Sequence, residues 1–198
     1  MESIPGVFGF ETFMERTLEY MPMSVRMKLD LCGCKLSLLQ WCGLPLAVRQ
    51  CVLEMDCGGR EEILRLRRYL QSSVDALELG PLALLQCDPG SWGAQSRMPP
   101  ELVSAIGELG LPRPGRAAWS ALSDLQRFAL TKLAQAGRAR KLRAALEEFG
   151  LHAGNGQFTA PESAAGGQEA QVFAFLARGL GEGPHREFTR EIDRGVGG

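Results

Sequence analysis

The chain is poor in the residues and motifs on which most enzyme active sites depend. It has only two histidines, His152 and His185, and both lie in a glycine-rich C-terminal stretch. A serine or cysteine nucleophile that works with histidine needs that histidine ordered in a cleft. No H-E-x-x-H motif, no Walker loop and no G-x-G-x-x-G after a strand occurs. We therefore expect a protein that is not an enzyme and that needs no cofactor.

Charge and hydropathy exclude further classes. The net charge is −1 and the pI is near 6.2, so no overall basic field exists to hold nucleic acid or an anionic membrane. No apolar run reaches the roughly 18 residues that a membrane-spanning helix needs. The opening residues, MESIPGVFGFE, carry no basic segment before an apolar run. We expect no signal peptide and a cytoplasmic location.

Six cysteines are present, and five of them fall in the first third of the chain. In the cytoplasm they should stay reduced, so a disulfide framework is not expected. Cys32 and Cys34 are too close together for the C-x-x-C spacing of a metal knuckle, and no other pair has that spacing. Burial as small apolar residues, ligation of a metal or an iron–sulfur cluster, and incidental exposure all stay open.

The clearest local pattern is the helix expected within residues 117–134. Ser123 and Gln126 form a capping box that opens this helix. An apolar stripe at helical spacing follows it, with Leu125, Phe128 and Leu133 among its members.

The same pattern of apolar and polar residues occurs earlier in the chain. The motif of Trp41, Leu44 and Arg49 matches Trp119, Leu122 and Arg127 at an offset of 119 − 41 = 78. The preceding Met-Pro-to-Gly segment, residues 21–33, matches residues 98–110 at an offset of 98 − 21 = 77. Chance similarity between amphipathic helices is the alternative. We predict an all-α domain, residues 1–150, made of two similar units (about 21–79 and 98–149) that pack about a pseudo-two-fold axis.

The first of these matched segments has two readings. Val25, Met27, Leu29 and Leu31 alternate with charged residues as in a strand, yet Val25, Leu29 and Cys32 also share a helical face. Its partner segment does not alternate, so we predict a helix in both, with Pro22 at the start and Gly33 past the end. Further helices are expected at residues 8–20, from the Ser37–Gln40 capping box through Trp41, and at 46–55, 60–79 and 138–149.

The helix at 138–149 carries its charges in the unfavourable order. Arg138, Arg140, Lys141 and Arg143 come first and the two glutamates, at 147 and 148, come last. This order opposes the helix dipole. Either these charges form a solvated face, or the basic edge meets an acidic partner.

Two stretches read as connections. Residues 80–98 contain turn signals and link the two units, with Trp92 expected to pack back on the body. Residues 151–198 are rich in glycine and form a flexible tail, in which only 168–180 has a helical pattern.

One set of polar and tryptophan residues forms the candidate binding site for a partner or an anion. If the units pack about the two-fold axis, Trp41 and Arg49 should approach Trp119 and Arg127. An arginine-lined groove for an anionic group or an acidic protein patch would result. The alternative is that the tryptophans are core anchors and the arginines pair with carboxylates at helix ends. The candidate site comprises Arg26, Lys28, Asp30, Lys35, Trp41, Arg49, Trp119, Gln126 and Arg127.

Taken together, three segments of the chain resemble a known family. They are FGFE, the longer MPMSVRMKLDLCGCKLSLLQW, and LSDLQRFALTKL. This combination is similar to the bacterial nitrate reductase-associated proteins, over about residues 8–149. Cys32 fits the family pattern, whereas Cys34, Cys42 and Cys51 are additions.

The resemblance implies a non-enzymatic accessory protein of assimilatory nitrate reductase. Its partner would be the reductase or its precursor, and its role would be to assist assembly, maturation or cofactor loading through protein contact. The alternative function is a carrier, in which Cys32 and Cys34 hold metal or iron–sulfur, or the arginine set holds an anionic cofactor. An enzyme that acts on a small substrate is a third reading, which needs a closed pocket.

Overall fold

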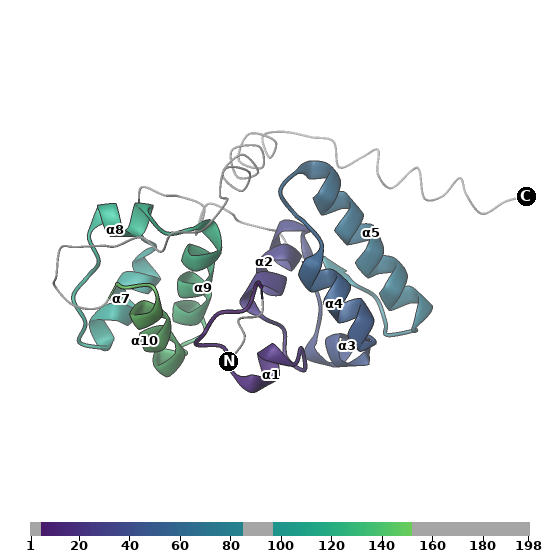
Figure 1. The fold of residues 1–198 in the computed structure, drawn as a ribbon, viewed down its shortest axis with the longest axis horizontal. Helices are drawn as coiled ribbons and strands as arrows, with labels where there is room; N and C mark the ends of the chain where they lie inside the picture. The colour runs from purple at the N-terminus through teal and green to yellow at the C-terminus, as the bar shows by residue number, and fades with distance from the viewer. Residues whose placement is uncertain (1–4, 85–96, 152–198) are drawn as a thin grey trace, which may run out of the picture.

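Helices joined by short loops make up nearly all the regular structure of residues 5–84 and 97–151, which are the residues that the computed structural model describes (Figure 1). The elements are α1 (Phe13–Arg16), α2 (Met23–Leu31), β1 (Cys34–Lys35), α3 (Leu38–Gly43), α4 (Leu46–Glu54), α5 (Arg60–Ala76), β2 (Ala83–Leu84), α7 (Pro100–Glu108), α8 (Arg116–Ser120), α9 (Asp124–Gln135) and α10 (Ala139–Glu148). The mostly helical class is as predicted. None of the described helices combines the length and hydropathy that crossing a bilayer requires.

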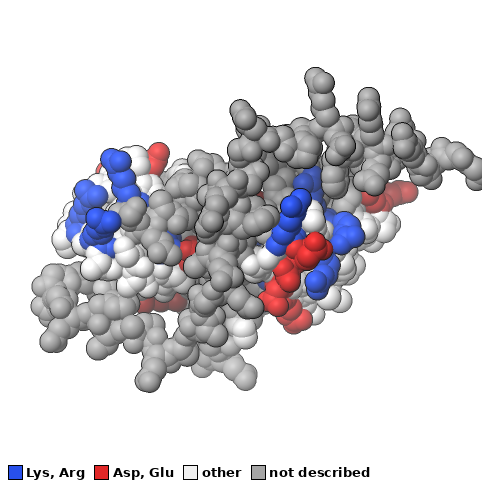
Figure 2. Space-filling view, turned by 90° about the horizontal axis from the view of Figure 1, so that it is seen from above, with Lys and Arg blue, Asp and Glu red and all other residues white. Residues whose placement is uncertain are grey.

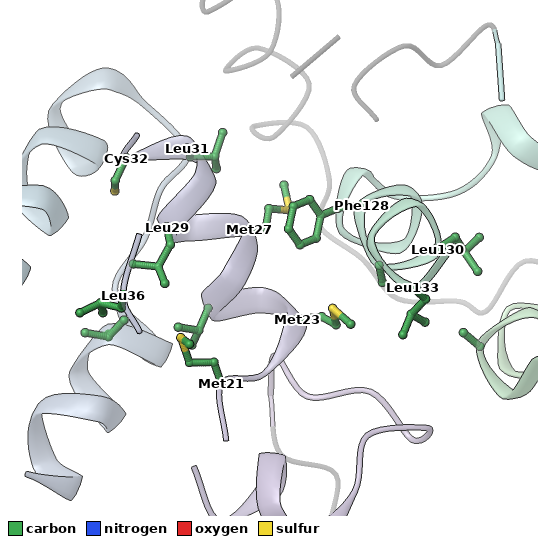
Figure 3. Close-up of a cluster of buried hydrophobic side chains, with 14 of the residues drawn as sticks. Met21, Met23, Met27, Leu29, Leu31, Cys32, Leu36, Phe128, Leu130 and Leu133 are labelled. Atoms are coloured by element: carbon green, nitrogen blue, oxygen red, sulfur yellow. The ribbon is translucent and has the colours of Figure 1, made fainter. Parts of the chain in front are cut away.

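Helix α2 lies in the middle of the molecule, between α4 and α9 (Figure 1). Figure 3 shows Met23 and Met27 on its α9 side, with Met27 beside Phe128, and Leu29 and Cys32 on the opposite side. Because the helix is covered on two sides, apolar residues occupy more than a single stripe. This burial explains why the sequence of α2 alternates like a strand although the segment is helical.

Helix α9 is the second buried helix, and α2, α7 and α10 all pack against it. Its whole middle, Arg127 to Thr131, is buried, although two of these side chains are polar. The predicted apolar stripe therefore covers only part of the buried surface of α9.

The predicted helix boundaries hold at both serine capping boxes and at Gly33 and Gly110, whereas α5 ends at Ala76, before the predicted end at residue 79. Ser37 and Ser123 each accept a hydrogen bond from the backbone of the glutamine three residues later, which completes both capping boxes. Gly33 and Gly110 follow α2 and α7 with φ of 63° and 67°, which a residue with a side chain rarely adopts. Local chemistry thus sets these ends.

The expected helix over residues 8–20 is wrong in its extent, because α1 spans only Phe13–Arg16. Phe8 and Phe10 instead stack on each other, and both meet the ring of Phe149 edge-on. Glu11 accepts hydrogen bonds from the backbone N–H of Phe8 and of Met23, each at 2.8 Å. Long-range contacts thus hold this segment in a non-helical path against α2 and the end of α10.

Strands β1 and β2 pair antiparallel, Cys34 with Leu84 and Lys35 with Ala83, and the sequence did not indicate this ladder. It joins the end of α2 to the chain that follows α5. The predicted positions of Trp92 and of a helix at 168–180 lie outside the described residues.

The packing of the two halves differs from the predicted symmetry. A two-fold axis that brings α2 against α9 would also bring α7 against α4. Figure 1 instead places α4 and α7 on opposite sides of the central α2 and α9. The structure therefore does not confirm the pseudo-two-fold arrangement.

Candidate functional site

The first predicted tryptophan–arginine pair holds the backbone of the N-terminal segment. Trp41 is fully buried on α3, and its indole N–H donates to the carbonyl of Leu18 at 2.8 Å. Arg49 of α4 donates to the same oxygen at 2.7 Å. Leu18 is buried with a φ of 60°, a left-handed conformation that is rare for leucine. This pair fixes a strained turn.

The second predicted tryptophan–arginine pair is also buried, on α8 and α9. Trp119 and Arg127 are each 1% exposed. The Arg127 guanidinium is bonded to the Asp124 carboxylate and to the Leu122 carbonyl. Burial raises the pKa of Asp124 and Arg127 opposes this, with a net rise above the usual value. A buried guanidinium that is already paired offers no open anion site.

The structure does not bring the two pairs together. Helices α3 and α4 lie on one side of α2, and α8 and α9 lie on the other side (Figure 1). Trp41 and Trp119 thus have separate surroundings, as core anchors do. The predicted groove between them does not form among the described residues.

The remaining predicted site residues mostly bind their own chain. Lys28 donates to the carbonyls that end α4, at 3.3 Å from Val52 and 2.5 Å from Leu53 and Met55. Asp30 pairs with Lys132 of α9 at 2.8 Å.

Three residues of the set lie nearer the surface. Arg26 and Lys35 are exposed, and Arg26 Nε donates to the Met21 carbonyl at 3.0 Å. Gln126 completes the capping box of α9, where its side-chain oxygen accepts the Ser123 N–H at 2.9 Å. Arg26 and Gln126 thus bind backbone groups close to helix starts.

The unfavourable charge order of α10 has a tertiary cause. Lys141 pairs with the buried Glu15 of α1 at 2.5 Å. Glu148 accepts the backbone N–H groups of Gly9 and Phe10, each at 2.7 Å. The basic edge of α10 does meet an acidic group, and that group belongs to the same chain. The charges of α10 dock the N-terminal segment.

Replacing Glu15 by glutamine should lower the free energy of unfolding by about 1.5–3 kcal/mol at pH 7, the range for hydrogen bonds to charged groups. Glutamine keeps the capping box with Thr12 but loses the ion pair with Lys141. Denaturant titration measures the loss, and the exposed Glu61→Gln is the matched control.

The pH dependence gives a second measure of the same interaction. Burial raises the pKa of Glu15, but hydrogen bonds from Lys141 and Thr12 outweigh it, so the net pKa lies below the usual 4.5. The stability that Glu15 contributes is complete above pH 4.5 and is lost as the pH falls through the lowered pKa. The acid limb of the stability curve should therefore flatten in Glu15→Gln. An unchanged acid limb would contradict this role.

The cysteines do not assemble a metal centre among residues 5–84 and 97–151. No group of three histidine, cysteine or acidic side chains there has the arrangement of a metal site. Cys32 and Cys34 are buried, as expected for small apolar residues, whereas Cys42 and Cys51 are exposed. Cys87, His152 and His185 lie outside the described residues.

Seven large apolar side chains are exposed among the described residues, and the sequence analysis missed them. Leu39 is the most exposed of them at 83%, and it stands on the first turn of α3. We define the α3 rim as Phe13, Tyr20, Leu38, Leu39, Leu46, Leu77 and Leu84. Leu38 and Leu39 lie on α3 itself, and Leu46 begins the next helix, α4. Exposed apolar side chains that lie close together are typical of an interaction surface.

Hydrogen bonds join the segments that carry the α3 rim. Gln40 of α3 donates to the carbonyls of Leu79 and Pro81, at 3.3 and 3.2 Å. Cys42, also on α3, lies 3.5 Å from the carbonyl of Glu19. The chain around residues 19–20 and the chain around 77–84 are thus both tied to α3, which lies with α1 along the lower edge of Figure 1.

Other surfaces are charged. Figure 2 shows lysine and arginine side by side with aspartate and glutamate over α5. Such mixing is usual on a solvated helix face and makes no patch of one sign. The α3 rim, in contrast, offers several large apolar groups in place of charge.

Comparison with known proteins adds the family. A model of the conserved nitrate reductase-associated proteins matches residues 7–149. The chain belongs to this family. The match contains nearly all the described residues and confirms the resemblance that the sequence motifs indicated. The searches of curated proteins and of solved structures found no match.

The segments that carried the resemblance make several of the contacts described above. Glu11, the last residue of FGFE, binds the beginning of α2. Trp41 binds the N-terminal turn, and the LSDLQRFALTKL segment contains the buried residues Arg127 to Thr131 of α9. These segments therefore help to hold the N-terminal segment and α9 in place.

Proposed function

We propose that this nitrate reductase-associated protein is a non-enzymatic cytoplasmic accessory protein that binds nitrate reductase or its precursor and assists assembly, maturation or cofactor loading. Membership of the family carries this proposal, because the family is named for an association with the reductase. The residues of the candidate site that are buried form structural contacts, and a binding role for the exposed ones, Arg26 and Lys35, remains part of the proposal.

The α3 rim is the surface that we propose for this contact. Protein interfaces have an apolar centre from which charged residues are depleted. Leu39 and Phe13 are 83% and 71% exposed, and Leu84 is 72% exposed. Side chains this exposed contribute little to folding, so their apolar character is best explained by a partner that covers them. Lys35, which pairs with Ala83 next to Leu84 in the two-stranded ladder, would lie at the edge of such an interface.

Replacing Leu39 by glutamate tests the surface. The variant should bind purified nitrate reductase, in its cofactor-free or its loaded form, at least about tenfold more weakly than the wild type, a loss of about 1.4 kcal/mol. Leu39 is the second residue of α3, where an acidic side chain suits the helix dipole. The fold should therefore be retained, and binding can be measured by biolayer interferometry.

The matched control is Ala117→Glu. Ala117 is exposed and is the second residue of α8. The substitution therefore introduces the same charge at the same helix position, on the other side of the molecule (Figure 1). It should bind as the wild type does. If Leu39→Glu also binds normally, the α3 rim is not the contact surface. If the wild type binds neither form of the reductase, direct association is wrong.

We also propose that the chain contains two copies of one helical unit. Helices α2 and α7 begin 100 − 23 = 77 residues apart, and α4 and α9 begin 124 − 46 = 78 residues apart. In both halves the first helix packs on the third, α2 on α4 and α7 on α9. An experimental structure should superpose residues 21–79 on 98–149 helix for helix. A different path between the helices would contradict the duplication.

A further inference from the structure

The two halves of the chain differ in charge. Residues 97–151 carry nine lysines and arginines against five aspartates and glutamates, a net charge of 9 − 5 = +4. Residues 5–84 carry nine against ten, a net charge of 9 − 10 = −1. Figure 2 shows basic side chains gathered at the left end of the molecule, which carries α7, α8 and α10 in Figure 1. A near-neutral chain thus has one end that is locally positive.

Exposed arginines supply this positive charge. Both lysines of residues 97–151 bind acidic residues of the first half, Lys132 with Asp30 and Lys141 with Glu15. Every exposed basic side chain of the second half is an arginine. None of these arginines lies within ion-pair distance of a carboxylate in the described part of the chain. We define the arginine surface by the five that follow residue 110: Arg113, Arg116, Arg138, Arg140 and Arg143.

A hydrogen bond joins two of the segments that carry these arginines. Arg143 of α10 donates to the carbonyl of Leu109, at the end of α7, at 2.8 Å. Arg113 follows Leu109 by four residues, so the two Cα atoms lie at most about 14 Å apart. Arg116 comes three residues later, and Arg140 lies one turn before Arg143 on the same face of α10. A single partner surface of ordinary size, about 800 Å², can therefore cover these arginines.

Folding does not account for arginine at three of these positions. Arg116 is the first residue of α8, and Arg138 and Arg140 lie at the start of α10. A positive charge at the start of a helix opposes the helix dipole and lowers stability. For Lys141 the ion pair with Glu15 offsets this loss, whereas Arg138 and Arg140 have no acidic partner among the described residues. A contact with another molecule explains why these positions are basic.

The composition of this end favours a surface of protein carboxylates as the ligand. Arginine binds carboxylates through two parallel hydrogen bonds and is enriched at protein interfaces, whereas lysine is depleted there. The large exposed apolar side chains of the described residues all lie between residues 13 and 84. The arginine surface therefore lacks the aromatic groups that stack on nucleic-acid bases and the apolar groups that enter a membrane.

We propose that the arginine surface contacts an acidic surface of nitrate reductase, while the α3 rim makes the apolar contact. This inference rests on the proposed association with the reductase and adds a second contact on the other half of the chain. Opposite charges at the edge of an interface mainly accelerate the encounter and orient the partners, and salt weakens this effect. Most other interface contacts act on the dissociation rate. The two surfaces should therefore be separable by kinetics.

Charge reversal tests the arginine surface. At about 50 mM NaCl, Arg113→Glu with Arg116→Glu should lower the association rate constant for nitrate reductase at least about tenfold and leave the dissociation rate constant within about twofold of wild type. At about 500 mM NaCl, charges are screened beyond about 4 Å, so the association rate constants should agree within about twofold. Biolayer interferometry measures both constants with the form of the reductase that the wild type binds.

The matched control is Arg65→Glu with Arg68→Glu on α5. These two arginines are also exposed and three residues apart, so the same charge change is made on the other half of the chain. The association rate constant should stay within about threefold of wild type. Arg138→Glu with Arg140→Glu is the second test pair. It should slow association at low salt without a loss of stability, because acidic residues suit the start of α10.

The outcomes separate this contact from the association itself. If the wild type binds the reductase but both arginine variants associate as fast as it does, or the α5 control slows equally, the inference is overturned and the association stands. If the wild type binds neither form of the reductase, both fail. Arginine-dependent retention on duplex DNA or on phosphatidylserine vesicles at about 150 mM NaCl would also overturn the inference. Because Ala117→Glu adds a charge next to Arg116, it is compared with Leu39→Glu at about 500 mM NaCl.

Discussion

Replacing Asp124 by alanine is expected to lower the free energy of unfolding by about 3–5 kcal/mol, the usual cost of breaking a buried ion pair from one side. Asp124 is 5% and Arg127 1% exposed, so the variant leaves a guanidinium buried without its carboxylate. Denaturant titration measures the loss. The pair of Asp30 and Lys132 is the control, because Lys132 is 35% exposed and Asp30→Ala should cost no more than about 1 kcal/mol.

A double substitution separates the charge from the packing. Burial is the dominant influence on the Asp124 carboxyl and raises its pKa, so the pair is held at a desolvation cost. Replacing Asp124 by leucine together with Arg127 by methionine removes both charges and keeps the apolar volume. We expect this double variant to be more stable than Asp124→Ala. If the effects of the two single substitutions simply add, the buried pair is not coupled and this account is wrong.

The local part of the fold could be predicted from sequence because its signals are local. The capping boxes at Ser37 and Ser123 and the glycines at 33 and 110 act on neighbouring backbone and need no knowledge of the rest of the chain. The helix predicted for residues 23–31 was also correct. That prediction relied on the matched segment at 100–108, whose sequence does not alternate and which is helical as well.

The tertiary part could not be predicted in the same way. The segment 8–20 has helical spacing, but Glu11 binds the start of α2 and the rings of Phe8 and Phe10 pack on Phe149. These partners lie 12 or more residues away and leave no periodic signal. The same holds for Lys141, whose partner on α1 is 126 residues away. One sign of these contacts is visible in the sequence. The basic residues of α10 come first and its glutamates last, which is unfavourable for an isolated helix and indicates partners elsewhere in the chain.

The candidate site could not be predicted either, because its residues are placed by tertiary contacts. Motif matching selected tryptophans and arginines, and the structure buries Trp41, Trp119 and Arg127. Residue types that are frequent in binding sites are also frequent in cores that need an anchored polar group. The α3 rim escaped notice because leucine is usually expected inside a protein, and only the fold shows which leucines are exposed.

Replacing Trp41 by alanine is the second change with a large expected effect, a loss of about 3–5 kcal/mol in the free energy of unfolding. The side chain is 0% exposed, and its removal opens a cavity between α3 and the N-terminal turn. The turn should also be released, so limited proteolysis near residues 17–20 should accelerate. The exposed Leu38→Ala, three residues earlier on α3, should change neither measurement appreciably.

The Leu18 carbonyl provides the sharper test, because two donors share it. Trp41→Phe removes the indole N–H, and Arg49→Met removes the guanidinium, yet in each single variant the other donor remains. Each should cost about 0.5–1.5 kcal/mol as a hydrogen bond. The double variant leaves a buried carbonyl unpaired on a residue already strained at a φ of 60°, which adds about 1–3 kcal/mol beyond the sum. Strict additivity would mean that water replaces the lost donors, and that the two side chains do not act together to hold the turn.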